Sequence, residues 1–122
     1  MSWIILENVA SITSQRKELI RKGTRGMTTL ERAIETYGKD MQLNVAIEEF
    51  SELIKEICKN KRGAENINNI TEEIADCYIM LEQLKIIFEI KNNSIYLVMG
   101  QKLDRLKNRL DERSENEVKH SN

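Results

Sequence analysis

The stretch LNVAIEEFSELIKEI, residues 43–57, decides the fold that we expect for this chain. Its apolar residues recur every three or four positions, which is the period of an α-helix and not of a β-strand. At about 100° per residue they fill an arc of roughly 120° centred on Phe50. Glu49 and Glu52 fall together along one side of that arc. The pattern predicts an amphipathic helix over roughly 40–59.

A second apolar stripe follows in ITEEIADCYIMLEQLKIIF, residues 70–88. This stripe is less regular, because Glu73 falls within an otherwise apolar arc and Asp76 lies at its border. The polar segment 60–69 separates the two stripes and is expected to form a loop. If the two helices pack as an antiparallel hairpin, their acidic residues can face each other across the interface.

The remaining chain also favours helices. Thr28 and Glu31 have the spacing of a capping box, and Gly38 is a plausible end for the helix that they begin. Further helices are expected over 2–22 and 94–113, and no segment shows sustained strand alternation. We therefore expect an all-α bundle of four or five helices. The expected division is an N-terminal helical extension (1–26), an all-α domain (27–113) and a polar tail (114–122).

Composition narrows the class of protein. The chain has 122 residues, which favours one domain, and 19 Lys and Arg against 20 Asp and Glu give a net charge of −1. A general nucleic-acid binder carries a strong basic excess, so we expect no stable nucleic-acid binding. The apolar run WIIL (3–6) has four residues, too few for a signal peptide or a membrane span. Cys58 and Cys77 lack metal-ligand spacing, so we expect core thiols in the cytoplasm.

The acidic residues form two matched pairs. Residues three apart on a helix are surface neighbours, so Glu49 pairs with Glu52, and Glu73 with Asp76. In the antiparallel hairpin the four carboxylates would converge, and buried carboxylates without partners are costly. A cation resolves the repulsion, and carboxylate oxygens suit Mg²⁺ or Mn²⁺. The competing interpretation is an oligomer interface in which Lys or Arg side chains pair with these acids.

These motifs resemble a known family. EEFSE (48–52), twenty intervening residues and EIAD (73–76) are similar to the EExxE and ExxD motifs of the MazG-like all-α nucleoside triphosphate pyrophosphatases. KLDRLKNRL (102–110) resembles the basic C-terminal helix of many members, and the compact length is similar to phage and prophage versions. The resemblance covers about 28–110, most of the chain.

The resemblance implies a hydrolase that converts a (d)NTP and water to the (d)NMP and pyrophosphate by water attack at the α-phosphorus. Carried over by position, Glu49, Glu52, Glu73 and Asp76 would hold Mg²⁺, with Mn²⁺ as the alternative ion. Glu52 or Glu49 would act as the catalytic base, and the residues leave that choice open. Glu48, the first glutamate of the motif, would be peripheral.

Basic side chains are needed to bind the outer phosphates of a triphosphate. Lys102 and Arg105 are three residues apart on the expected last helix, and Lys55 follows the first acidic motif. The candidate contacts to the nucleobase are Trp3, Tyr37, Gln42 and Tyr78, and Gln42 lies about two turns before Glu49, within reach of the same cavity. A homodimer or homotetramer is expected, because short helices leave apolar surface exposed and the family resemblance implies the same. Two alternatives stay open: a non-enzymatic helical adaptor, and a member that binds nucleotides without cleaving them.

Overall fold

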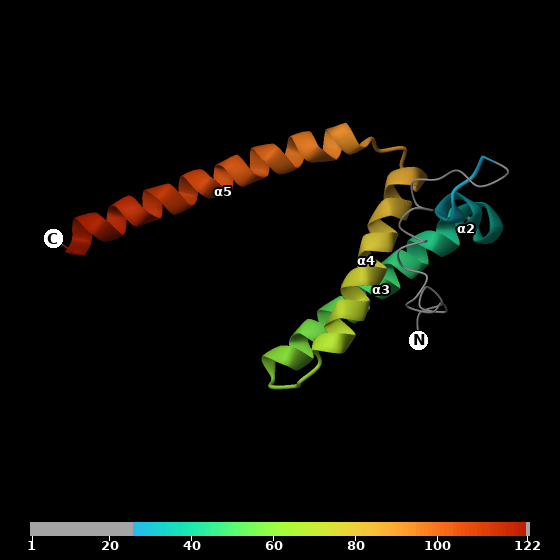
Figure 1. Ribbon diagram of the computed structural model, residues 1–122, viewed down its shortest axis with the longest axis horizontal. Helices are drawn as coiled ribbons and strands as arrows, with labels where there is room; N and C mark the ends of the chain where they lie inside the picture. The colour runs from blue at the N-terminus through green and yellow to red at the C-terminus, as the bar shows by residue number, and fades with distance from the viewer. Residues whose placement is uncertain (1–25, 122) are drawn as a thin grey trace. The chain divides into compact units, whose positions relative to one another are not determined.

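The computed structural model describes residues 26–121, and all regular structure in that range is helical (Figure 1). The helices are α2 (Thr29–Tyr37), α3 (Lys39–Lys61), α4 (Ile67–Ile87) and α5 (Asn92–Ser121). The predicted all-α class is therefore confirmed for this part of the chain, whereas the helix predicted over 2–22 lies outside the described residues. The chain divides into two compact units, one holding α2 to α4 and the other holding α5. None of the described helices combines the length and the hydropathy that a membrane crossing requires.

The capping box predicted for α2 is present. The Thr28 hydroxyl oxygen accepts a hydrogen bond from the Glu31 amide at 3.2 Å, and the Glu31 carboxylate accepts one from the Thr28 amide at 3.0 Å. These two bonds satisfy amides that an α-helix leaves without internal partners at its start. Gly38 ends α2 with a φ of 89°, a conformation that a side chain would strain, and α3 begins at the next residue. The turn between α2 and α3 thus depends on a single glycine.

Helices α3 and α4 form the predicted antiparallel hairpin, and Figure 1 shows the chain reversing direction between them. The connection is shorter than the predicted loop, because α3 continues to Lys61 and α4 already begins at Ile67. Asn66 stabilises this short connection: its side-chain nitrogen donates to the Glu56 carbonyl at 2.9 Å and to the Glu56 carboxylate at 2.5 Å. The loop is therefore fastened to the end of α3 by buried hydrogen bonds.

The inner side of the hairpin includes only one edge of the arc centred on Phe50 that the sequence predicts: Ala46 is buried, and Phe50 packs against the buried cluster. The buried residues of α3 include Gln42, Glu49 and Glu56, which stand seven residues apart. Isoleucines of the predicted arc are instead largely exposed (Ile47 65%, Ile54 62%). The hydrophobic period locates an apolar arc, but it does not say which edge of that arc faces the neighbouring helix.

The buried face of α4 has a matching composition. Asp76 and Gln83, also seven residues apart, are buried together with Glu73, Cys77 and Met80. A seven-residue step keeps side chains on one seam of a helix that packs along a partner. The hairpin therefore encloses a polar seam, to which Val45, Ala46 and Met80 contribute the buried hydrophobic cluster.

The effect of the polar seam on stability can be tested at Gln42 and Gln83. Both side chains are fully buried, and none of their four amide atoms has a hydrogen-bond partner among the described residues. A buried amide without a partner costs on the order of 1–3 kcal/mol. Replacing both residues by methionine, which has a similar shape, is therefore expected to raise the free energy of unfolding by at least about 1 kcal/mol.

Urea denaturation of the double variant measures this effect, with Gln101→Met, an exposed position on α5, as the control. A variant less stable than the wild type would mean that the buried amides are satisfied in solution.

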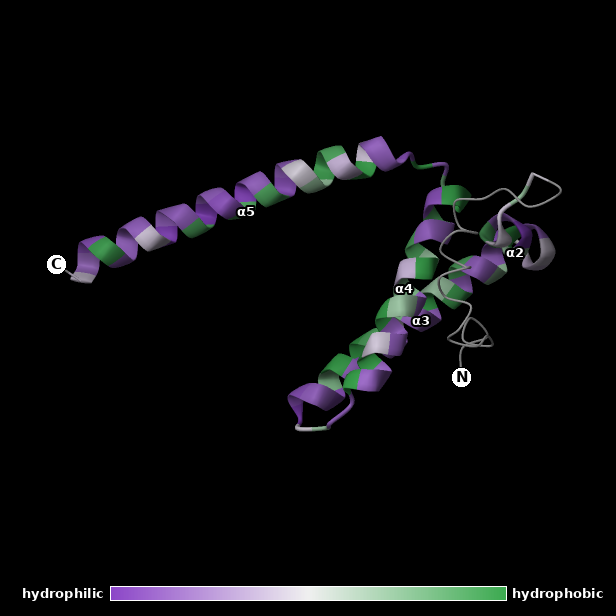
Figure 2. Cartoon of the chain, viewed as in Figure 1, coloured by the Kyte–Doolittle hydropathy of each residue, from purple (hydrophilic) through white to green (hydrophobic). Residues whose placement is uncertain are grey.

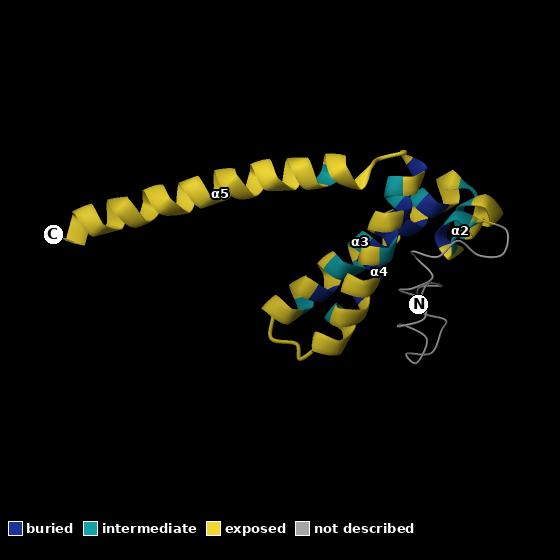
Figure 3. Ribbon diagram, turned by 45° about the horizontal axis from the view of Figure 1, so that its top comes forward, coloured by how far each residue is buried: buried dark blue, intermediate teal, exposed yellow. Residues whose placement is uncertain are grey.

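Helix α5 continues through 114–121, where the sequence predicts only a polar tail. Two ion pairs on its surface, Lys107 with Asp111 at 3.0 Å and Arg113 with Glu117 at 3.1 Å, join residues one turn apart. Exposed pairs of this kind contribute a few tenths of a kcal/mol each, and the segment lacks glycine and proline. Apolar and polar residues alternate along α5 in Figure 2, and Figure 3 shows that nearly all of this helix is exposed.

Candidate metal centre

Three carboxylates converge inside the hairpin: Glu49 from α3, and Glu73 and Asp76 from α4. One oxygen of each lies within 4.8 Å of the others. All three side chains are buried, with exposures of 1% for Glu49, 9% for Glu73 and 2% for Asp76. We call this group the acidic cluster. Its convergence follows from the three-residue step on α4, which directs two acids to one face, and from the antiparallel partner helix.

The register of the two helices holds the cluster together. The Cys77 thiol donates to the backbone carbonyl of Glu49 at 3.6 Å, so one residue of the cluster region is bonded directly to the facing helix. Ala46 and Met80 are almost completely buried nearby, and a small side chain at Ala46 permits close approach of the helices. A slip of one residue would move Glu49 away from Asp76.

The electrostatics of the cluster are unfavourable without a cation. One oxygen of each carboxylate (Glu49 Oε2, Glu73 Oε2 and Asp76 Oδ2) is buried without a hydrogen-bond partner, and none forms an ion pair within residues 26–121. Burial, followed by the charges of Glu52 and Glu49, raises the pKa of Glu73 to about 7. Burial and the proximity of Glu49 also raise the pKa of Asp76. Because carboxylates of like charge repel, a cation among them stabilises the ionised forms.

Glu52 is the fourth predicted ligand, and it stands apart from the acidic cluster. It is half-buried on α3, and it is not among the three residues whose oxygens converge. Its charge contributes to the raised pKa of Glu73, so it faces the same part of the hairpin. Three of the four predicted ligands are thus brought together, and ligation by Glu52 stays a prediction. Glu48, interpreted as peripheral, is exposed.

Glu56 is a further buried carboxylate on α3, and the sequence pattern did not single it out as a site residue. It is buried, it accepts from Asn66, and it forms an ion pair with Lys59 at 3.4 Å. The hydrogen bond from Asn66 is the main cause of its lowered pKa, with Lys59 adding to the effect. Glu56 therefore fastens the loop and is not part of the cluster. Its position seven residues after Glu49 is the feature of the sequence that could have indicated its place on the inner seam.

Among the predicted substrate contacts, the three basic residues are exposed and Gln42 is buried. Lys55 is exposed on α3, and Lys102 and Arg105 are exposed on α5, which belongs to the other unit. Gln42 is fully buried one heptad from Glu49, so it presents no surface to solvent in the single chain. The roles of these four residues in substrate binding stay predictions.

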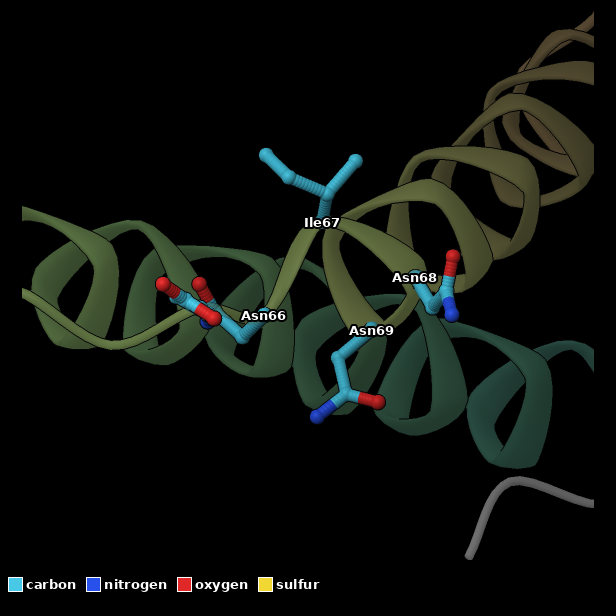
Figure 4. Close-up of a pocket in the computed structure, with 5 residues that line it drawn as sticks. Asn66, Ile67, Asn68 and Asn69 are labelled. Carbon is cyan, nitrogen blue, oxygen red and sulfur yellow. The ribbon is translucent and has the colours of Figure 1, made fainter.

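A polar hollow of about 320 Å³ lies at the start of α4 (Figure 4). It is lined by Glu65, Asn66, Ile67, Asn68 and Asn69. None of these residues belongs to the acidic cluster, which is enclosed between the helices. The cluster and this surface hollow are therefore separate features of the hairpin.

Comparisons with known proteins leave the family open. No family model matches the chain, and no solved structure matches it. The chain is 29% identical over 108 residues to the tRNA-2-methylthio-N(6)-dimethylallyladenosine synthase of three strains of Clostridium botulinum. That similarity covers 80% of this chain and 23% of the synthase, so the chain spans about a quarter of the relatives that it matches. What the molecule itself displays is an all-α hairpin with an acidic cluster able to bind a metal ion.

Proposed function

We propose that this chain is a metal-dependent nucleoside triphosphate pyrophosphohydrolase. The observation that supports the proposal is the convergence of three buried carboxylates, each with an unpartnered oxygen, from two facing helices. Structural acids on a helix are normally exposed or paired, because an isolated buried charge is costly. An arrangement that is unstable by itself and complete with a cation is typical of a metal site. The resemblance of EEFSE and EIAD to the MazG-like motifs supplies the reaction.

The donor set fits a hard divalent ion. Glu49, Glu73 and Asp76 offer carboxylate oxygens only, which favours Mg²⁺ or Mn²⁺ over softer metals. Glu52 stands close enough to add its charge to the site. When bound, the ion neutralises the phosphate oxygens and the charge that develops on the leaving pyrophosphate. Without it, the acidic cluster would repel a polyanionic triphosphate.

Glu52 is the favoured general base among this chain's residues. It is half-buried and keeps access to water, whereas Glu49 is almost completely buried within the cluster. In the proposed reaction a water oxygen forms a bond to the α-phosphorus as the bond to the bridging oxygen breaks. The proton of the water passes to the Glu52 carboxylate, and pyrophosphate departs with the bonding electrons.

The similarity to the tRNA-modifying synthase supports a second candidate, a helical module that binds tRNA. The net charge of −1 argues against this candidate, because phosphate backbones are bound by a basic excess. Binding of tRNA at physiological salt, without hydrolysis of any nucleotide, would favour it over the pyrophosphatase.

The direct test is pyrophosphate release from a panel of common and modified NTPs and dNTPs, measured with Mg²⁺, Mn²⁺ or EDTA. We expect pyrophosphate and monophosphate in equal amounts, only with a divalent ion, and the ranking of substrates would identify the base and sugar. Folded protein that releases no pyrophosphate from any member of the panel would contradict the proposal.

Lys102 offers a prediction about substrate binding. If its ammonium group binds the outer phosphates, Lys102→Ala should raise KM about tenfold while kcat changes little, because one charge-assisted hydrogen bond is lost. Steady-state kinetics measure the effect, and Lys119→Ala, exposed on the same helix, is the matched control. An unchanged KM would place the phosphate contacts elsewhere.

A further inference from the structure

Asn66 stands just before α4, at the position from which an asparagine side chain ordinarily caps its own helix. Here the side chain makes no hydrogen bond to the first turn of α4. Its amide nitrogen donates to the Glu56 carbonyl at 2.9 Å and to the Glu56 carboxylate at 2.5 Å, and its amide oxygen accepts from the Asn60 side chain at 3.2 Å. All the polar atoms of this side chain therefore bond to α3, and α4 begins without a side-chain cap. We call the two bonds between Asn66 and Glu56 the latch.

The latch lies at the same separation from the acidic cluster on both arms of the hairpin. Glu56 follows Glu49 by seven residues, and Asn66 precedes Glu73 by seven residues. Seven residues of helix rise by about 10.5 Å, and a seven-residue step keeps side chains on one seam. Glu56 is also near enough to Glu73 for its charge to contribute to the raised pKa of that carboxyl group. The latch therefore belongs to the seam that holds the cluster, two turns nearer the loop.

A metal ion among the three carboxylates needs a finer alignment of the two helices than hydrophobic packing provides. Ligand distances at a metal site vary by only about 0.2 Å, whereas sliding α4 by one residue would displace it by about 1.5 Å. Apolar contacts in the cluster of Ala46 and Met80 have no preferred direction, so they tolerate small axial shifts. Hydrogen bonds weaken steeply when their geometry changes. A directional contact between the arms is therefore needed to set the level of Glu73 against Glu49.

Within residues 26–121, the directional contacts between the two arms come from two places. One is the Cys77 thiol, which donates to the Glu49 carbonyl at 3.6 Å, and a thiol is a weak donor. The other is the latch, whose two residues are both buried. One of its bonds ends on a carboxylate, and a hydrogen bond to a charged acceptor is stronger than one between neutral groups. The latch is thus the stronger of the two contacts that fix the axial register of the hairpin.

We propose that Asn66 is a positioning residue for the metal ligands, because its bonds to Glu56 set the level at which Glu73 and Asp76 meet Glu49. None of its hydrogen bonds goes to the acidic cluster, so it acts on the ion only through the placement of α4. The proposal rests on metal binding at the cluster, which is part of the proposed function, and it does not depend on the reaction.

The test is the affinity of the full chain for Mn²⁺, measured without substrate by the electron paramagnetic resonance signal of the free ion. Asn66→Ala removes the latch and is expected to raise Kd about 10- to 100-fold, because changes to groups that orient metal ligands commonly have that effect. Thr28→Ala is the control for stability, since it removes the capping box of α2 and leaves the hairpin contacts unchanged. Its Kd should equal that of the wild type. Asn68→Ala, at an exposed position beside the latch, should also bind Mn²⁺ as the wild type does.

The outcomes separate the positioning role from general stability and from the enzyme. An unchanged Kd in Asn66→Ala would overturn the proposal. An equal rise in Kd in Thr28→Ala would do the same, because weaker binding would then follow from lost stability and not from register. A wild type that binds no Mn²⁺ would overturn the metal centre and the positioning role together. A raised Kd in Asn66→Ala supports the positioning role even if the wild type releases no pyrophosphate, in which case the proposed reaction alone fails.

A measurement on the wild type decides the question if Asn66→Ala does not fold. Coupling between two sites is reciprocal, so an ion that binds more tightly because of the latch must also stabilise the latch. Mg²⁺ should therefore slow hydrogen exchange at the Ile70 amide, which donates to the Asn66 carbonyl at 3.0 Å, relative to exchange in EDTA. The Arg32 amide, which donates to the Thr28 carbonyl at 3.0 Å, should exchange equally in both conditions. Equal exchange at Ile70 with Mg²⁺ and with EDTA would contradict the positioning role.

Discussion

Replacing Glu73 by glutamine is expected to lower metal-dependent pyrophosphate release by more than about 100-fold, because even the neighbours of metal ligands commonly affect metal affinity or activity 10–100-fold. The same change is expected to stabilise the metal-free protein. Glu73 is buried beside Glu49 and Asp76, and a neutral amide of the same shape removes one of three repelling charges. A loss of function coupled to a gain in stability distinguishes a ligand from a structural residue.

Turnover and the melting temperature in EDTA measure the two effects together. Glu72→Gln is the matched control, since Glu72 is the preceding residue and is exposed. The control should leave both quantities unchanged. A Glu73→Gln variant that melts below the wild type in EDTA would mean that Glu73 makes a stabilising contact. A variant that retains full turnover would remove Glu73 from the site.

The second large effect concerns how the free energy of unfolding depends on pH in the absence of metal. The pKa of Glu73 rises from its ordinary value of 4.5 to about 7, chiefly because of burial. Between these values the unfolded chain has lost the proton that the folded chain retains, so the unfolded state binds fewer protons. The free energy of unfolding therefore falls as pH rises through this window, by at most about 3 kcal/mol for this group. The raised pKa of Asp76 acts in the same direction.

Magnesium should reverse this trend, because the ion binds the ionised carboxylates and displaces their protons. We expect the melting temperature in EDTA to fall from pH 5 to pH 7.5, and the gain on adding Mg²⁺ to be largest at the upper end. The lowered pKa of Glu56 affects stability mainly below 4.5, outside this window. In Glu73→Gln the slope should become shallower, and the part that comes from Asp76 should remain. A wild-type melting temperature that rises through the window in EDTA, or an unchanged slope in the variant, would contradict the assignment.

Both effects arise because the hairpin uses its interior for polar groups. Gln42, Glu49, Asp76 and Gln83 occupy the positions that a hairpin selected for stability alone would fill with leucine. Such an interior is weakly stabilising for a single chain, while the isoleucines that could have filled it face outward.

Local features were the part of the fold that sequence could predict. The capping box of Thr28 and Glu31 and the end of α2 at Gly38 depend on neighbours in sequence, and the acidic pair Glu73 and Asp76 depends on one turn of helix. The predicted end of the last helix at 113 was wrong, because a polar composition alone does not end a helix and residues 114–121 contain no glycine or proline. The loop predicted over 60–69 is longer than the observed connection. The connection is fastened by hydrogen bonds from Asn66, just before α4, to Glu56 on α3, and contacts between separate elements do not appear in a local sequence pattern.

By itself, the sequence predicted helices and placed Glu49 with Glu52, and Glu73 with Asp76, as neighbouring pairs on two of them, since periodicity and three-residue spacing are properties of one helix. Only the tertiary structure decided which edge of the arc around Phe50 turns inward. That choice buries Gln42, separates Glu52 from the acidic cluster and exposes Ile47 and Ile54. The physical reason is that rotation of a helix about its axis is set by its partner: every rotation has the same period, and the packing of two surfaces selects one of them.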